Sequence, residues 1–451
     1  MRSIQVEGHP ATTTGLHATL VAVATAYIDE VHHAQCTLQT PIMYARMDCH
    51  GVGEDLNQAV RMLAVALSQR RQLVLLPPAP QTARHQCQVP ISIPLDAKQP
   101  WHWLAGQSLP LESIFVLSAC HKMLLQEMPD VIEAMAQSAS GNVTRTARAL
   151  GFTALGVAGR ESGTLWRSHI AISKHVPKVF QRQGLLWWFQ VLTTYLVRIR
   201  GPLAQLIEAH PAMQPFLKPN RPPPGGNGGS GDPASGLRWL GWNPHTTCAA
   251  ARFCDGVGTG WAPSVWFDAA VHIRQGDACH GASAGSGKYA SLRKCDLSLS
   301  AAIERLRAAG VHNGSLFFAS DSRHLIDQLE AGGARPFVGT YLRINRTRFE
   351  TGAGTQHIEL RTARLSSLVE ALMDMVLLAR SSVLAGKMMS NFPRLALQLR
   401  VRMPSAKPAY VSLDGRPWCT RTSCRDGFAD REDQNRSLRR ELLRNPVVAW
   451  E

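Results

Sequence analysis

Three polar residues close an apolar segment of this chain. Residues 265–273 are expected to form a buried strand, and His272, Arg274 and Asp277 lie at or just beyond its end. In open α/β sheets ligands bind outside the carboxyl ends of the strands, and arginine offers a rigid fork of N–H donors that fits a phosphate group. His272 and Arg274 share one face of an extended chain, and Gly276 lets the backbone turn before Asp277. The pattern predicts a nucleotide-sugar site, with a strand-end arginine paired to a carboxylate as the structural alternative.

Later segments place further polar groups where such a site needs them. A second apolar strand ends in Asp321, an otherwise apolar helix contains Asp374, and a helix starts at Ser390 and Asn391. A carboxylate in an apolar helix is costly unless it has a partner, and a helix start favours phosphate. Two structural alternatives stay open, namely pairing of Asp374 with Arg380 and a simple helix cap at Ser390.

The second half of the chain alternates between strand and helix patterns. The expected strands cover residues 265–273, 316–320, 383–386 and 410–413, and the expected helices cover 297–309, 322–331, 364–379 and 392–403. This alternation is typical of a parallel, doubly wound α/β sheet.

Four of these segments together resemble one glycosyltransferase family. They are Val271-His272-Ile273-Arg274-Gln275-Gly276-Asp277, Leu316-Phe317-Phe318-Ala319-Ser320-Asp321-Ser322, Ala371-Leu372-Met373-Asp374-Met375-Val376-Leu377-Leu378-Ala379 and Ser390-Asn391-Phe392-Pro393-Arg394-Leu395-Ala396. Their types and order resemble the α1,6-fucosyltransferases, both the animal core enzymes and the rhizobial chitin-oligosaccharide enzymes, and more loosely the protein O-fucosyltransferases. The resemblance covers roughly the second half of the chain.

The resemblance implies a fold and a reaction. The implied fold is α/β and glycosyltransferase-B-like, with a Rossmann-like C-terminal domain that binds the nucleotide. The implied enzyme is an inverting, metal-independent glycosyltransferase that moves fucose from GDP-fucose to a glycan or glycoprotein acceptor, which includes acceptors that contain N-acetylglucosamine. It uses no cofactor besides its donor substrate, and the chain contains no Asp-x-Asp metal-binding motif.

The same resemblance implies roles for individual residues. Arg274 holds the β-phosphate of the donor, while Asp321 and Asp374 contact the guanosine. His272 contacts the donor or orients Arg274, and a buried histidine without such a role is the alternative. The implied donor-binding residues in this half are His272, Arg274, Asp321, Asp374, Ser390 and Asn391.

A weaker resemblance lies near the start of the chain. Gly51 and Gly53 precede a helical pattern over residues 56–68 and a strand pattern over residues 71–76. This order resembles the start of the N-terminal domain in the same family and adds both glycines to the donor-binding residues. An ordinary loop is the alternative.

Two departures from the family pattern bear on activity. Gln275 stands where most members have a second arginine, and Ala278 stands where they have a lysine. The general base of the family is a glutamate, and none occurs in residues 278–288. Asp277 or His280 could replace it, and the candidate catalytic residues are Arg274 and Asp277. These departures motivate an alternative function, a catalytically degenerate homologue that binds nucleotide or glycan without turnover.

Length and composition suggest how the chain is divided. Its 451 residues are too many for one typical domain. The first part is expected to be mainly helical, with helices over residues 114–125 and 184–207 among the stronger ones. The expected divisions are an N-terminal α/β acceptor-side domain over 1–217, a Pro/Gly-rich linker or insertion over 218–236, the Rossmann-like domain over 237–430 and a helical tail over 431–451.

Charge limits the classes of partner. The net charge is +15 and the sequence pI is about 9.7, which favours anionic partners. The basic residues are scattered without a run of five or six, so no nucleic-acid partner is expected. A metal hydrolase that uses His272, Asp277, Cys279 and His280 is a further alternative, and it predicts bound zinc.

Cysteines and hydropathy bear on location. Ten cysteines include three pairs that are close in sequence, namely 248 with 254, 279 with 295 and 419 with 424, although sequence alone cannot fix connectivity. The longest N-terminal apolar stretch, residues 20–28, is shorter than the roughly 20 residues that a bilayer needs. We expect the Golgi lumen, with membrane attachment only through a missing N-terminal anchor, and the cytoplasm as the alternative.

Overall fold

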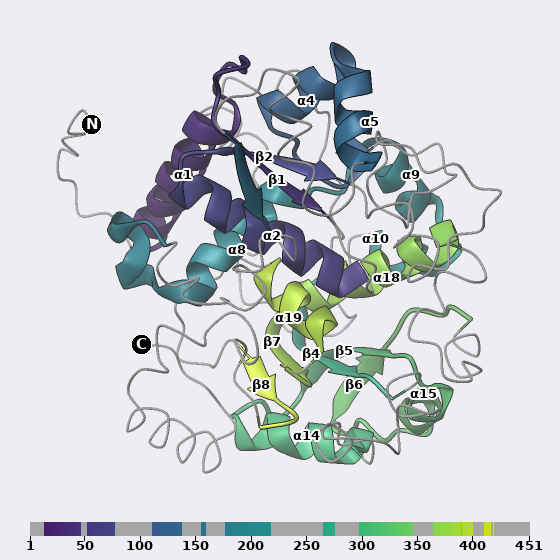
Figure 1. Cartoon of the computed structure of the whole chain (residues 1–451). Coiled ribbons are helices and arrows are strands. Elements are labelled where there is room, and N and C mark those ends of the chain that lie inside the picture. The colour runs from purple at the N-terminus through teal and green to yellow at the C-terminus, as the bar shows by residue number, and fades with distance from the viewer. Residues whose placement is uncertain are drawn as a thin grey trace, which may run out of the picture.

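The protein is an α/β protein with two parallel sheets, as its computed structural model shows (Figure 1). The structure describes residues 13–46, 52–76, 111–137, 155–158, 176–217, 265–275, 297–345, 364–388, 390–399, 410–415 and 418. The predicted linker (218–236) and tail (431–451) lie outside these ranges, so the predicted domain boundaries remain a prediction.

The sheet of the second half carries the candidate site. Its strands are β4 (Phe267–Ile273), β5 (Gly314–Ser320), β6 (Phe337–Thr340), β7 (Ser381–Gly386) and β8 (Tyr410–Ser412). They are all parallel, in the order β6-β5-β4-β7-β8. The central strand β4 is buried along its length except at Asp268, because helices cover a parallel sheet from both sides.

Helices cover the two faces of this sheet. One face packs against α14 (Leu299–Ala308) and α15 (Arg323–Glu330), and the other packs against α18 (Arg364–Ala379) and α19 (Asn391–Gln398). The strand and helix patterns therefore predicted the other four strands and the four helices of this half, but they missed β6. The helix expected over residues 364–379 coincides with α18. The helix expected over residues 392–403 corresponds to α19, which ends at Gln398, and residues 400–403 lie outside the described residues.

The first half contains a smaller parallel sheet in the order β2-β1-β3. Its strands are β1 (Ile42–Arg46), β2 (Gln72–Leu76) and β3 (Leu155–Ala158). The surrounding helices are α1 (Thr13–His32), α2 (Val52–Ser68), η2 (Leu111–Ser113), α4 (Ala119–Gln126), α5 (Pro129–Gln137), η5 (Lys178–Gln183), α8 (Gly184–Leu196), α9 (Gly201–Ala209), η6 (Pro211–Met213) and α10 (Gln214–Leu217).

Two predicted helices of this half were wrong in extent. The helix expected over residues 114–125 begins only at α4, because Phe115 forms a β-bridge with Val197 and Ser118 caps the helix by accepting from the backbone N–H of His121. The single helix expected over residues 184–207 is two helices, α8 and α9. The break covers residues 197–200, and α9 begins at Gly201, whose φ of +55° lies in the left-handed region that glycine readily adopts.

The two sheets are joined through a common apolar core. Helix α19 lies between the sheets and packs against α2 and α8 (Figure 1), and one hydrophobic cluster contains Leu63 of α2, Trp188 of α8 and Leu395 of α19. Polar contacts cross the same boundary. The amide of Gln190 donates to the Leu397 carbonyl at 3.0 Å, and the Thr193 hydroxyl donates to Gln398 Oε1 at 3.1 Å.

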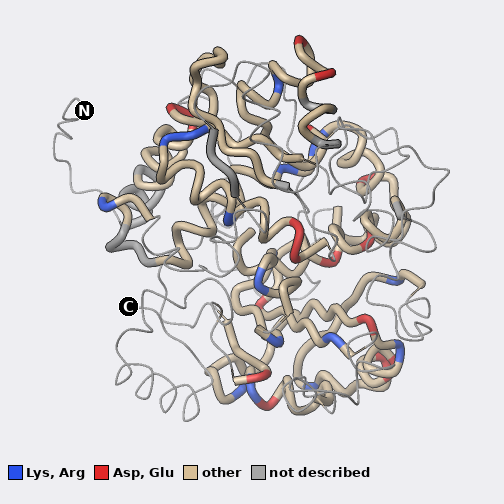
Figure 2. Tube along the Cα trace, viewed as in Figure 1, with Lys and Arg blue, Asp and Glu red and all other residues tan. Residues whose placement is uncertain are grey.

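A disulfide joins Cys36 to Cys120 across 84 residues of sequence. It ties the segment after α1 to the first turn of α4. The three cysteine pairs that are close in sequence lie outside the described residues. Among the helices that the structure describes, none has the length and apolarity to cross a membrane, and charged residues are scattered over the described elements (Figure 2).

Candidate functional site

Polar side chains from three strands meet at the carboxyl edge of the larger sheet. Arg274 follows β4, Asp321 follows β5 and Lys387 follows β7. The Nε atom of Arg274 lies 3.9 Å from Oδ2 of Asp321, and the Arg274 side chain is 40% exposed. The Lys387 ammonium donates to the backbone carbonyl of Arg274 at 3.1 Å. The sheet edge thus presents a guanidinium that solvent and ligands can reach.

Asp321 is hydrogen-bonded to the backbone just after β4. Its Oδ1 atom accepts a hydrogen bond from the backbone N–H of Gln275 at 2.6 Å. Nearby, the Ser320 hydroxyl donates to the Ile273 carbonyl at 2.7 Å. The structural alternative for Arg274, pairing with a nearby carboxylate, is therefore present in the molecule. A carboxylate that orients an arginine is compatible with phosphate binding, and the guanosine contact of Asp321 stays a prediction.

Gln275 has a structural role of its own. Its side-chain amide donates to the Leu297 carbonyl at 2.6 Å, just before α14. This bond gives a physical reason for a glutamine where a second arginine was expected. Asp277, Ala278 and His280 lie outside the described residues, so the candidate base and the zinc alternative stay predictions.

His272 is buried and lies against α19. Its residue is 7% exposed, and its ring stacks on Phe392 with the centroids 5.0 Å apart and an interplanar angle of 27°. The register pairs His272 with Gly386 of β7. The alternative of a buried histidine therefore has direct geometric support, and a direct donor contact stays a prediction.

The start of α19 lies next to these strand ends. Ser390 occupies the N-cap position, but its side chain accepts no capping bond, and its Oγ is buried without a hydrogen-bond partner in the part of the chain that the structure describes. The simple cap proposed as an alternative is therefore wrong. Gly386 lets the strand approach this helix closely, because a Cβ there would lie 2.7 Å from Cβ of Pro393.

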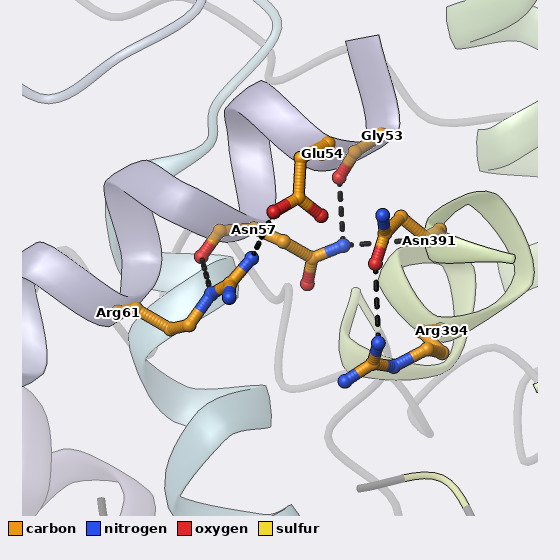
Figure 3. Close-up of polar contacts among 6 residues, drawn as sticks. All are labelled: Gly53, Glu54, Asn57, Arg61, Asn391 and Arg394. Atoms are coloured by element: carbon orange, nitrogen blue, oxygen red, sulfur yellow. Dashed lines mark hydrogen bonds and ion pairs between the residues drawn. The ribbon is translucent and has the colours of Figure 1, made fainter. Parts of the chain in front are cut away.

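Gly53 lies in the first turn of α2 and faces the first turn of α19 (Figure 3). A Cβ atom on Gly53 would lie 3.1 Å from the backbone nitrogen of Phe392 and 3.2 Å from the carbonyl carbon of Asn391. Helix α2 begins at Val52, so the glycine turn expected before the helix and the ordinary-loop alternative are both wrong for Gly53, which is helical and makes a close backbone approach. Gly51 lies outside the described residues.

One asparagine connects these two helix starts. The Asn57 side-chain amide donates to the Gly53 carbonyl at 2.7 Å and to the Asn391 carbonyl at 3.1 Å (Figure 3). The backbone carbonyl of Asn57 in turn accepts from Nε of Arg61. The Nη2 atom of Arg61 also lies 2.8 Å from Oε1 of Glu54. Asn57 thus fixes α19 from the other half of the chain.

Arg394 adds positive charge behind the start of α19. Its guanidinium donates to Oδ1 of Asn391 at 3.1 Å, and the residue is 5% exposed. Burial, with a smaller contribution from the positive charge of Arg61, lowers the pKa of Arg394 to about 10, so it stays charged at neutral pH. Sequence reasoning missed Asn57, Arg394 and Lys387. For Asn57 the available signal was an asparagine within a helical pattern, and for Arg394 it was an arginine just after a helix start.

Asp374 is placed on a different element from the strand ends. It is 7% exposed within α18, one turn after Glu370, whose carboxylate lies 4.0 Å from Nε2 of His210 in the first half. A buried acid needs a compensating partner. The contact of Asp374 with guanosine stays a prediction.

The close approach at Gly53 predicts the effect of a single methyl group. Alanine normally stabilises a helix by about 1 kcal/mol over glycine, but in Gly53→Ala the methyl must push the α19 backbone away. We expect a net loss of about 1 to 3 kcal/mol in the free energy of unfolding, and weaker GDP binding, measured by urea unfolding and calorimetry.

Gly310→Ala is the control for this prediction. Gly310 has φ of +80°, and a Cβ atom added there would meet no atom within 4 Å, so alanine adds backbone strain far from the strand ends. It should lower stability and leave GDP affinity unchanged. A Gly53→Ala protein as stable as the parent would contradict the close approach.

Comparison with known proteins gives fold-level similarity only. No protein-family model and no curated protein matches the chain. Among solved structures, it is similar to NodZ α1,6-fucosyltransferase with GDP (12% identity, 79% of this chain and 92% of that one, TM-score 0.33). It is also similar to a variant of FUT1 from Arabidopsis thaliana with GDP (10%, 87% and 78%, 0.33) and to POFUT1 with GDP (11%, 84% and 99%, 0.33). TM-scores this low carry no argument about the function of this chain.

Proposed function

We propose that this protein is an inverting, metal-independent glycosyltransferase that moves fucose from GDP-fucose to a glycan acceptor. The observation that carries the proposal is the position of Arg274, a reachable guanidinium at the carboxyl end of the central strand of a parallel sheet, oriented by Asp321. Ligands of such sheets bind at this edge. The sequence resemblance to fucosyltransferases gives the ligand its chemical identity.

The proposed reaction separates charge at this edge. An acceptor hydroxyl attacks C1 of fucose from the face opposite the diphosphate and loses its proton to a base, for which Asp277 is the candidate. The bond from C1 to the β-phosphate oxygen breaks, and its electron pair stays on GDP. Arg274 stabilises this growing negative charge in the transition state.

The remaining residue roles follow the same proposal. Asp321 and Asp374 recognise the guanosine, Ser390, Asn391 and the amides after them face the phosphates, and His272 supports Arg274. Gly51 and Gly53 belong to the acceptor-side half, over 1–217, which approaches the donor half, over 237–430. The disulfide between Cys36 and Cys120 favours an oxidising compartment such as the Golgi lumen.

A donor screen tests the function directly. Purified protein is offered GDP-fucose, GDP-mannose and UDP-sugars with glycan acceptors, and GDP release and glycan product are measured, while calorimetry measures GDP binding. Turnover of GDP-fucose alone supports the proposal. GDP binding without turnover supports the alternative function, a degenerate homologue. The observation that favours this alternative is Gln275, which is hydrogen-bonded to the Leu297 carbonyl and leaves the strand end with one arginine fewer than most family members have. Absence of GDP binding overturns both.

Metal dependence provides a second check. We expect excess chelator to leave the rate of fucose transfer unchanged, because arginine charge replaces a metal at the diphosphate in the proposed mechanism. Rates are compared with and without chelator, and after addition of Mn²⁺ or Mg²⁺. If chelator stops turnover and metal restores it, the mechanism is wrong, and Asp277, Asp321 and His280 become candidate ligands.

A further inference from the structure

An exposed asparagine lies where the chain enters β5. Asn313 is on the bend between α14 and β5, and with Gly314 and Ser315 it forms the sequence Asn-Gly-Ser. Asn-x-Ser/Thr, with any residue except proline in the middle, is the acceptor sequence for N-linked glycosylation. Such a short sequence also occurs by chance, so its meaning depends on what the fold requires of each of the three residues.

The fold explains Gly314 and Ser315 without a glycan. Gly314 has φ of +117°, and a Cβ atom there would collide with the carboxylate of Asp268 on β4. The Ser315 hydroxyl donates to Oδ2 of Asp268 at 2.9 Å and accepts from the backbone N–H of Asp268 at 3.1 Å. These two residues therefore attach the start of β5 to β4.

The fold requires no such contact of Asn313. The residue is exposed, and its side chain makes no hydrogen bond within the part of the chain that the structure describes. The neighbouring surface is open as well, because Val338 of β6, which pairs in register with Ser315, is 76% exposed. The side-chain amide of Asn313 is thus accessible, and a bulky group attached to it has room.

The position of Asn313 is remote from the candidate site and close to a strand edge. Asn313 precedes β5 and Asp321 follows it, so at about 3.3 Å per residue they lie roughly 25 Å apart along the strand. On the side of β5 opposite β4, the described sheet ends at β6 (Figure 1). An exposed edge strand is open to pairing with a second copy of the chain. A polar group on Asn313 would cover the start of this edge.

We propose that Asn313 carries an N-linked oligosaccharide that covers the β6 edge and leaves the edge with Arg274 free. The amide nitrogen of Asn313 bonds to C1 of the first sugar of a lipid-linked oligosaccharide diphosphate. The bond from C1 to the phosphate oxygen breaks, its electron pair leaves with the lipid diphosphate, and one amide proton passes to a base of the transferring enzyme. The disulfide between Cys36 and Cys120 supports the proposal, because disulfides form in the oxidising compartments through which glycosylated proteins pass.

The first test reads the modification directly. The full chain is expressed behind a cleavable secretion signal in cells that transfer N-glycans. The peptide that contains residue 313 is weighed by mass spectrometry before and after treatment with a peptide N-glycosidase. We expect an oligosaccharide mass that the enzyme removes and that Asn313→Gln lacks. His312→Gln, a change at the exposed neighbour, keeps the acceptor sequence and should keep the glycan. An unmodified Asn313 in the folded, secreted protein overturns the inference.

The second test locates the glycan on the molecule. Light scattering at increasing protein concentration measures self-association. Asn313→Gln and the enzymatically deglycosylated parent should self-associate at lower concentration than the glycosylated parent and His312→Gln. Adding Val338→Lys to Asn313→Gln should reverse this change, because a charged side chain on an edge strand opposes pairing. Equal self-association with and without the glycan overturns its placement over β6.

GDP binding separates this inference from the proposed function. Calorimetry should give the same GDP affinity with and without the glycan, since Asn313 lies at the opposite edge of the sheet from Arg274. A change in GDP affinity on glycan removal, at unchanged melting temperature, overturns the placement. A parent protein that binds no GDP overturns the proposed function, while the mass of the peptide that contains Asn313 still decides the inference.

Discussion

Replacing Arg274 with lysine should cost nearly as much activity as replacing it with alanine. The guanidinium holds the diphosphate through paired hydrogen bonds in a plane, and an ammonium cannot reproduce that fork. From the effect of removing one preorganised donor to a developing negative charge, we expect kcat to fall roughly 10²-fold or more in both variants. Steady-state kinetics with GDP-fucose measures this loss.

Arg323→Lys is the control for this conservative exchange. Arg323 starts α15 and pairs with Asp327 at 2.8 Å on the surface, where an arginine-to-lysine change should cost little. The two Arg274 variants should also keep the melting temperature of the parent, because the side chain is 40% exposed. Near-normal turnover by Arg274→Lys would refute the assignment of Arg274 to the diphosphate.

The protein should lose stability in mild acid because of buried histidines in the first half. Burial lowers the pKa of His121 to about 3. Burial also lowers the pKa of His32 well below its usual range, with smaller contributions from His33, His121 and Lys122. In the unfolded chain a histidine takes up a proton near pH 6.5, so the unfolded state binds more protons below that pH. Stability is full above pH 6.5 and falls as the pH drops towards 3.

For His121 the loss between pH 7 and pH 5 should be about 2 kcal/mol. Its Nδ1 accepts from the backbone N–H of Leu75 at 3.4 Å, and His121→Asn can keep an acceptor there without the titration. Urea unfolding at both pH values should therefore give a smaller pH dependence in this variant than in the parent. His312→Asn, at an exposed position, is the control, and an unchanged pH dependence in His121→Asn would contradict the expectation.

The sequence predicted the second half better than the first for a physical reason. Strands buried on both faces are continuous apolar runs bounded by polar turns, as at β4 and β5, and such runs are visible without partners. In the first half, the helix expected over residues 114–125 was wrong at its start because Phe115 pairs with Val197, a residue 82 positions away. That pairing is a tertiary contact, which local patterns do not report.

The candidate site was predictable only in part. Arg274 and Asp321 were found because each follows an apolar strand. Lys387 was missed because it lies near Arg274 only when β7 pairs with β4, and the spacing of residues along the chain does not reveal the order of strands in a sheet. Asn57 was missed for a similar reason: its partner, the carbonyl of Asn391, is 334 residues away.

The position of α19 has a consequence for synthesis on the ribosome. This helix follows α8 by roughly 200 residues, yet it covers apolar side chains of α2 and α8. At translation speeds of about 5 to 20 residues per second, the surface that it covers stays exposed for on the order of 10 to 40 seconds. During that time the nascent first half is open to chaperones and to aggregation, and it completes its core only when nearly the whole chain has been made.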